Sequence, residues 1–117
     1  MQERPGRLGA SERLVSDERT ELILSAVSSW EIAIKYALGR LVLPEPPSRY
    51  VPDRLLRSHT TSMPIEHSHA LQVATLPPVH GDPFDRLLIA QAQILGIPIL
   101  TGDPVFRRYD VEVIGVE

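Results

Sequence analysis

The clearest hydrophobic feature is a nearly continuous apolar run over residues 22–27, with the sequence LILSAV. A strand buried on both faces of a parallel sheet shows such a run, whereas a strand with one face in solvent alternates. The next segment, residues 28–39, carries apolar residues at helical spacing and ends at Gly39, a typical residue after a helix. We therefore predict a strand followed directly by a helix.

The middle of the chain holds shorter elements separated by prolines. Pro47 suits the first turn of a helix that continues past Tyr50. An extended piece follows over residues 59–65, where a proline indicates an edge strand or a strand end. A further helix is predicted over residues 66–76, ending before two consecutive prolines.

The C-terminal third shows the same alternation more clearly. Asp82 and Pro83 open a helix that extends to Gly96, and residues 97–101 form a short strand. Another aspartate-proline pair then begins a turn of helix, and residues 111–116 read as a last strand. Because strands alternate with helices throughout, the pattern predicts an α/β fold with a mainly parallel sheet.

Composition narrows the class of protein. With 117 residues, of which 43% are apolar, the chain suits one compact domain over residues 1–117. It has no cysteine, which excludes disulfides and thiolate metal sites, and no stretch approaches the roughly 20 apolar residues of a membrane span. We interpret it as a soluble, cytoplasmic protein that does not contact a membrane.

The formal charge of −3 argues against binding nucleic acid through an overall basic surface. It does not exclude a nuclease that depends on a metal. Such an enzyme needs an acidic pocket for the cation, and the cation presents positive charge to the phosphate.

Three acids are the candidate site, although each has a simpler explanation. Glu31 and Ser28 have the spacing of a capping box at a helix start, and Lys35 lies four residues further on, where it pairs with Glu31 on a helix surface. Asp85 lies in the first turn after the cap at Asp82, where the helix dipole favours an anion. Taken singly, each acid is better explained as a cap, including Asp103 before its proline.

The three acids together favour a different interpretation. Glu31 and Asp103 both follow the carboxyl ends of predicted strands, which is the edge where open α/β sheets form a ligand crevice. Asp85 can join them from its own helix start. Clustered carboxylates repel one another unless a cation compensates, and oxygen ligands without cysteine favour Mg²⁺ or Mn²⁺ over zinc.

The remaining polar candidates carry weaker predictions. His67 and His69 lie two apart on a predicted helix, so we expect them to point apart into solvent. His80, before the Asp82 turn, is a candidate for substrate contact, but with no identified partner it is better interpreted as structural. Arg86 is either a phosphate contact or a surface charge, and both interpretations stay open.

Three segments together resemble PIN domains of the VapC-type toxin branch. They are residues 25–41 (SAVSSWEIAIKYALGRL), residues 80–103 (HGDPFDRLLIAQAQILGIPILTGD) and residues 111–115 (VEVIG). The resemblance implies a three-layer sandwich with a mainly parallel central sheet flanked by helices. It also implies an Mg²⁺- or Mn²⁺-dependent endoribonuclease, the toxin of a type II toxin-antitoxin system, with RNA as substrate, a VapB-type antitoxin as partner, and homodimerisation.

The resemblance also assigns roles to individual residues. Glu31, Asp85 and Asp103 match acids that bind the metal and are catalytic. Thr101 matches a hydroxyl position beside Asp103. We also expect Arg86 to support the site. Asp82 matches an aspartate of the family motif, and this aspartate is better explained as a helix cap.

The front of the chain departs from the family pattern. Such domains begin with a strand whose aspartate is the first metal ligand, and the polar segment before Leu22 shows no such strand. Asp17, within that segment, is not a substitute. We expect a domain truncated at its N-terminus, through start-codon assignment, a shortened gene, or a sheet completed by a partner. The alternative function is a catalytically impaired remnant that binds antitoxin or dimerises.

Overall fold

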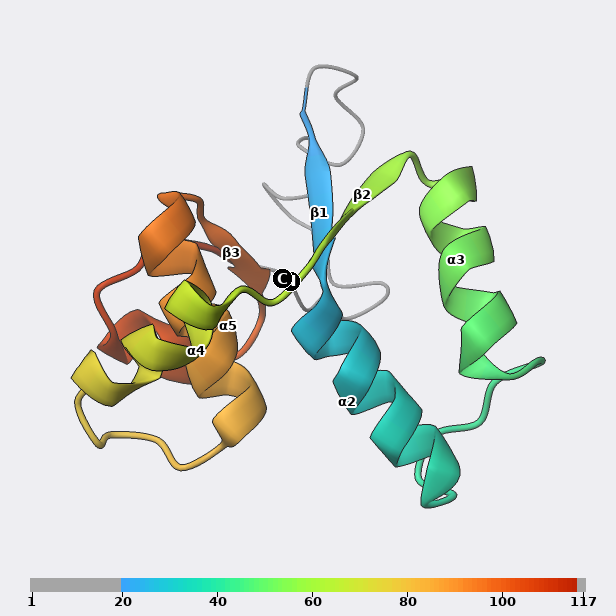
Figure 1. Ribbon diagram of the computed structural model, residues 1–117, viewed down its shortest axis with the longest axis horizontal. Coiled ribbons are helices and arrows are strands. Elements are labelled where there is room, and N and C mark those ends of the chain that lie inside the picture. Colours follow the sequence, from blue (N-terminus) through green and yellow to red (C-terminus); the bar gives the residue numbers. More distant parts are fainter. Residues whose placement is uncertain (1–19, 116–117) are drawn as a thin grey trace.

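The computed structural model of the protein describes residues 20–115 (Figure 1). The predicted polar segment at the front, Asp17 and the question of a first strand all lie outside these residues. The elements in chain order are β1 (Leu22–Ser25), α2 (Ala26–Ala37), α3 (Pro47–Arg57), β2 (Thr60–Met63), α4 (His67–Gln72), the 3₁₀ helix η1 (Val73–Thr75), α5 (Pro83–Leu95), β3 (Ile99–Thr101), the 3₁₀ helix η2 (Pro104–Arg108) and β4 (Val113–Gly115).

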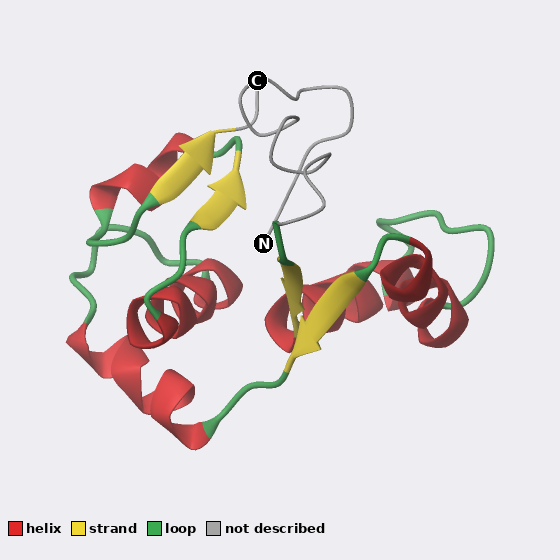
Figure 2. Cartoon of the chain, turned by 90° about the horizontal axis from the view of Figure 1, so that it is seen from above, coloured by secondary structure: helices red, strands yellow, loops and turns green. Residues whose placement is uncertain are grey.

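The described strands form two parallel pairs. β1 pairs with β2, with Leu22 opposite Thr60, and β3 pairs with β4, with Ile99 opposite Val113. Within residues 20–115 these are two separate two-stranded sheets, seen from above in Figure 2. The α/β class and the parallel strand pairing are therefore confirmed.

The core gathers around α5, whose inner face is buried along most of its length. Ile89 of α5, Val27 of α2 and Phe106 of η2 have no exposed surface. Each such side chain contributes about 1.5–3 kcal/mol relative to an exposed one. Val27 and Ile89 belong to the same buried cluster, so α2 packs against α5. The N-terminal end of α5 lies beside α2 (Figure 1).

The start of α2 differs from the prediction. The strand ends at Ser25, whose Oγ accepts a hydrogen bond from the backbone N–H of Val27 at 3.1 Å, so that Ser25 is the N-cap. The predicted strand end at residue 27 and helix start at residue 28 are therefore each wrong by two residues. An apolar run does not distinguish the end of a buried strand from the first turn of a buried helix.

The predicted starts of two helices and one strand end are confirmed, while β3 and β4 begin two residues later than predicted. Pro47 begins α3, β2 ends just before Pro64, and α5 begins after Asp82 and is capped at its end by Gly96. Gly96 has φ 65°, the left-handed conformation that favours glycine after a helix. No helix in the described part of the chain is long and apolar enough to cross a membrane.

His69 contradicts the prediction of a solvated side chain, since it is 2% exposed. Its Nδ1 accepts hydrogen bonds from the Glu66 backbone N–H at 3.0 Å and from the Gln91 side chain at 3.2 Å. The predicted helix over residues 66–76 is α4 followed by η1, and His69 lies on the face that packs against α5. His67 is exposed, as predicted.

Candidate functional site

Glu31 lies in the second turn of α2 and is not a cap. Since α2 begins at Ala26, the predicted capping box between Ser28 and Glu31 is wrong. The predicted pair with Lys35 is confirmed: Lys35 Nζ lies 2.9 Å from Glu31 Oε2. The Glu31 side chain is nevertheless only 13% exposed, which is unusual for a carboxylate with a merely surface role.

Asp85 lies in the first turn of α5 and is buried, with 7% of its surface exposed. Asp82 caps this helix, as predicted, because its Oδ1 accepts from the backbone N–H groups of Phe84 and Asp85 at 2.8 and 3.1 Å. Two carboxylates thus lie within the same turn, one acting as the cap and the other facing inward.

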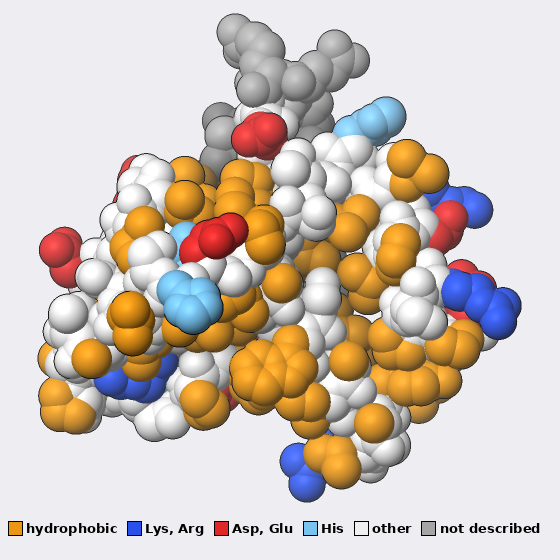
Figure 3. All heavy atoms as spheres, viewed as in Figure 1, with side chains coloured by type: hydrophobic (Ala, Val, Ile, Leu, Met, Phe, Trp, Pro, Cys, Tyr) orange, Lys and Arg blue, Asp and Glu red, His pale blue; other side chains and the backbone are white. Residues whose placement is uncertain are grey.

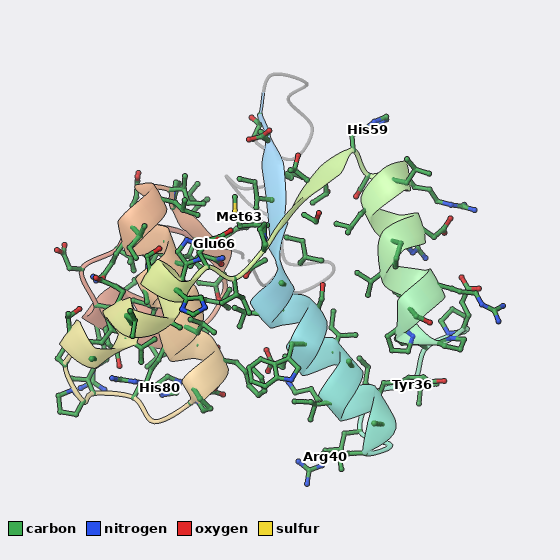
Figure 4. All side chains as sticks on the ribbon, viewed as in Figure 1. Tyr36, Arg40, His59, Met63, Glu66 and His80 are labelled. Atoms are coloured by element: carbon green, nitrogen blue, oxygen red, sulfur yellow. The ribbon has the colours of Figure 1, made fainter. Side chains whose placement is uncertain are left out.

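His80 is the partner of Asp85 that the sequence interpretation missed. Its Nε2 lies 2.9 Å from Asp85 Oδ2. Figure 4 labels His80 on the loop that leads into α5. One feature of the sequence could have indicated this contact. His80 lies five residues before Asp85, and the turn at Asp82 and Pro83 lies between them, so the loop can fold back toward the helix start.

Burial raises the pKa of the Asp85 carboxyl above its ordinary value of 3.8. The hydrogen bond and charge of His80 oppose this shift, while the nearby carboxylates of Asp82 and Glu31 add to it. Glu31 therefore lies close enough to Asp85 to act on its ionisation, and a cation beside these acids would favour the charged form.

Two aromatic rings join the helices that carry these acids. Trp30 and Phe84 pack edge to face, with ring centroids 4.8 Å apart and an interplanar angle of 76°. Each ring immediately precedes one of the acids, Glu31 on α2 and Asp85 on α5. This contact therefore links the two acid-bearing turns directly.

Asp103 follows the carboxyl end of β3, and its side chain caps η2, as predicted. Its Oδ1 accepts from the backbone N–H of Val105 at 3.0 Å. Thr101 is 3% exposed, and its Oγ1 accepts from the backbone N–H of Asp103 at 3.1 Å. The hydroxyl therefore fixes the backbone turn on which Asp103 lies.

Arg86 supports the loop before α5. One guanidinium nitrogen, Nη1, donates to the Pro77 carbonyl at 2.9 Å, the His80 carbonyl at 3.4 Å and the Tyr109 hydroxyl at 3.3 Å. The other, Nη2, donates to two further carbonyls. In this structure its hydrogen bonds hold the loop that carries His80.

The ligand-type atoms that lie within 4.8 Å of one another belong to His80, Asp82 and Asp85. Among the residues that the structure describes, no such group includes Glu31 or Asp103. The structure thus brings Glu31 into electrostatic range of Asp85, while Asp103 remains at the end of β3. His80 and Asp82 carry the ligand-type atoms that lie nearest to those of Asp85.

The PIN domain family matches residues 2–112, and the chain therefore belongs to that family. A stretch of 56 residues is 50% identical to Ribonuclease VapC16 of Mycobacterium tuberculosis (strain ATCC 25618 / H37Rv). This match covers 48% of the present chain and 40% of that ribonuclease, so the chain spans less than half of the relative's length. No solved structure matches the chain. The resemblance to VapC-type PIN domains is confirmed.

Proposed function

We propose that this protein is a divalent-metal-dependent endoribonuclease, the toxin component of a type II toxin-antitoxin system, acting in the cytoplasm as a single domain. Glu31, Asp85 and Asp103 are its proposed metal ligands and catalytic acids. The observation that carries the proposal is the buried Asp85 carboxylate, whose pKa is raised by burial and by the neighbouring acids. A carboxylate in such surroundings is typical of a functional site.

The donor set fits Mg²⁺ or Mn²⁺. The proposed ligands offer carboxylate oxygens, which hard divalent cations prefer, and the imidazole of His80 is held by Asp85. A cation bound here would offset the burial of the Asp85 carboxylate and the repulsion from Asp82 and Glu31, all of which raise the pKa of Asp85. The ion supplies Lewis-acid activation of the phosphodiester and of water.

The residues of the chain then have separate tasks. Glu31 and Asp85 hold negative charge at adjoining turns of α2 and α5, and Thr101 holds the Asp103 turn at the end of β3. Arg86 keeps the loop before α5 in place, as a supporting residue. The substrate class is RNA, as the name of the 50% identical relative suggests.

Cleavage of RNA by the full chain tests this function. Wild type should cleave single-stranded RNA with Mg²⁺ or Mn²⁺ present and lose activity with a chelator. Asp85→Asn should abolish cleavage, while Asp53→Asn, at a partly exposed aspartate of α3 paired with Arg57, should not. If wild type fails to cleave with either ion, the enzymatic proposal is wrong, and the catalytically impaired, partner-binding alternative gains.

Partner binding is the second proposed function, through a VapB-type antitoxin or a homodimer. Large apolar side chains are exposed over α2, α3 and the loop between them (Figure 3). Trp30 is 51% exposed, Leu38 61%, Val42 92% and Leu56 77%. Exposed apolar surface of this kind marks protein interaction sites.

Light scattering coupled to size-exclusion chromatography tests this surface. If the chain dimerises through it, Val42→Asp should reduce the measured mass toward that of one chain. The matched control is Leu71→Asp, because Leu71 is 73% exposed on α4. An unchanged dimer in Val42→Asp would exclude this surface as the dimer interface.

A further inference from the structure

We propose that His80 is a positioning residue that holds the Asp85 carboxylate in the orientation required for binding the divalent ion. This inference rests on the proposed function, since it takes Asp85 as a metal ligand. It adds a role for a residue outside the three acids.

The side-chain contact is short and lies against a buried group. His80 Nε2 is 2.9 Å from Asp85 Oδ2, while His80 itself is 27% exposed at its side chain and Asp85 10%. An ionised carboxylate accepts hydrogen bonds and does not donate them, so Nε2 carries the proton in this contact. One oxygen of Asp85 is thereby fixed, and with it the plane of the carboxylate.

The backbone of His80 is fixed independently of its side chain. Arg86 Nη1 donates to the His80 carbonyl at 3.4 Å and to the Pro77 carbonyl at 2.9 Å. Arg86 immediately follows Asp85 on α5, so the same helix turn holds the loop backbone and receives the imidazole. The imidazole therefore reaches Asp85 from a supported loop.

This arrangement matches the way proteins orient metal ligands. Carboxylates that bind a metal are hydrogen-bonded by neighbouring groups, and removing such a neighbour typically lowers metal affinity by about 10–100-fold. Without the hydrogen bond from His80, the Asp85 carboxylate would lose its rotational freedom only when the ion binds. This loss of entropy would lower the affinity for the ion. The loss of His80 should therefore be felt in metal binding more than in folding.

Direct ligation by His80 is the competing possibility, because its nitrogen lies within 4.8 Å of the donor atoms of Asp82 and Asp85. The two roles make different spectroscopic predictions. A nitrogen that is bonded to Mn²⁺ couples to the electron spin of the ion. An imidazole whose nitrogen donates to Asp85 Oδ2 is not bonded to Mn²⁺ and does not give this coupling. Electron spin-echo spectroscopy of the Mn²⁺-loaded chain should thus show no directly bound nitrogen.

The experiment measures Mn²⁺ affinity of the full chain by calorimetry. His80→Ala should weaken binding by about 10–100-fold. His80→Gln should recover most of the affinity, because its side-chain amide can donate to Asp85. His67→Ala is the matched control, since His67 is exposed, and should bind as wild type does. Each variant should remain folded, which thermal unfolding checks.

The outcomes separate the two claims. Saturable Mn²⁺ binding by wild type with equal affinity in His80→Ala overturns the positioning role and leaves the proposed function standing. A directly bound nitrogen, or no recovery in a folded His80→Gln, also overturns it. If wild type binds no Mn²⁺ and cleaves no RNA, the proposed function fails, and the positioning role fails with it.

Discussion

The indole ring of Trp30 packs edge to face on the ring of Phe84, with centroids 4.8 Å apart. Trp30 lies in α2 and Phe84 in α5, and each is followed by an acid of the candidate site. Because Trp30 is half exposed, this contact does not serve mainly to bury it. Its consequence is the relative placement of Glu31 and Asp85.

A double-mutant cycle on the two rings tests this contact. Trp30→Leu and Phe84→Leu should show a coupling of about 0.5–1.5 kcal/mol in the free energy of unfolding, the range for aromatic pairs. Denaturant unfolding of the four chains measures it. The control combines Trp30→Leu with Leu71→Ala on α4, for which the effects should add. If the effects of Trp30→Leu and Phe84→Leu on the free energy of unfolding simply add, the two rings do not couple the helices.

Sequence patterns predicted the elements but not all their boundaries. The helix starts at Asp82 and Asp103 were predictable, because an aspartate before a proline combines an N-cap with a residue suited to the first turn. The start of α2 was not, because Ser25, Ser28 and Ser29 are all able to cap. Which serine caps α2 depends on where β1 stops pairing with β2. That pairing joins segments far apart in the chain, so the local sequence does not predict it.

The sequence indicated the acids proposed for the site, but not the side chains that contact them. Asp85 and Glu31 could be selected from motif spacing, whereas the His80 contact requires the loop before α5 to fold back. The burial of His69 likewise depends on Gln91, 22 residues away on α5. Helical periodicity cannot predict a contact between two elements when the packing of their faces is unknown.

The buried histidine of α4 should contribute to stability. His69→Ala removes the acceptor for the Glu66 N–H and the Gln91 amide, and unpaired buried groups cost about 1–3 kcal/mol. Urea unfolding should show a loss in that range. His67→Ala, two residues earlier and exposed, should change the free energy of unfolding by less than about 0.5 kcal/mol. Equal effects of the two substitutions would contradict the assigned hydrogen bonds.

The cap at Asp82 should depend on an oxygen acceptor and not on charge alone. Asp82→Ala removes the acceptor for two backbone N–H groups and should cost about 1 kcal/mol of stability. Asp82→Asn keeps a side-chain oxygen and should lose much less. Thermal unfolding of both variants without metal checks this. If Asn is as damaging as Ala, the cap interpretation is wrong.

The raised pKa of Asp85 predicts a pH dependence of stability in metal-free buffer. Below the ordinary value of 3.8 the carboxyl is protonated in both states; as the pH rises, the unfolded chain releases its proton first. Wild-type stability therefore falls between 3.8 and the higher folded-state pKa. Asp85→Asn does not titrate at this position, so its unfolding temperature should rise relative to wild type across that window. A constant difference, or one of opposite sign, would contradict the burial argument.

The central claim is that Glu31, Asp85 and Asp103 bind one divalent ion, and calorimetric titration of the full chain with Mn²⁺ tests it most directly. Wild type should bind one ion per chain. Glu31→Gln, Asp85→Asn and Asp103→Asn should each weaken binding by more than about tenfold. The control Asp53→Asn, at a partly exposed aspartate of α3, should have wild-type affinity. Wild-type affinity in all three site variants, or no saturable binding by wild type, would contradict the account.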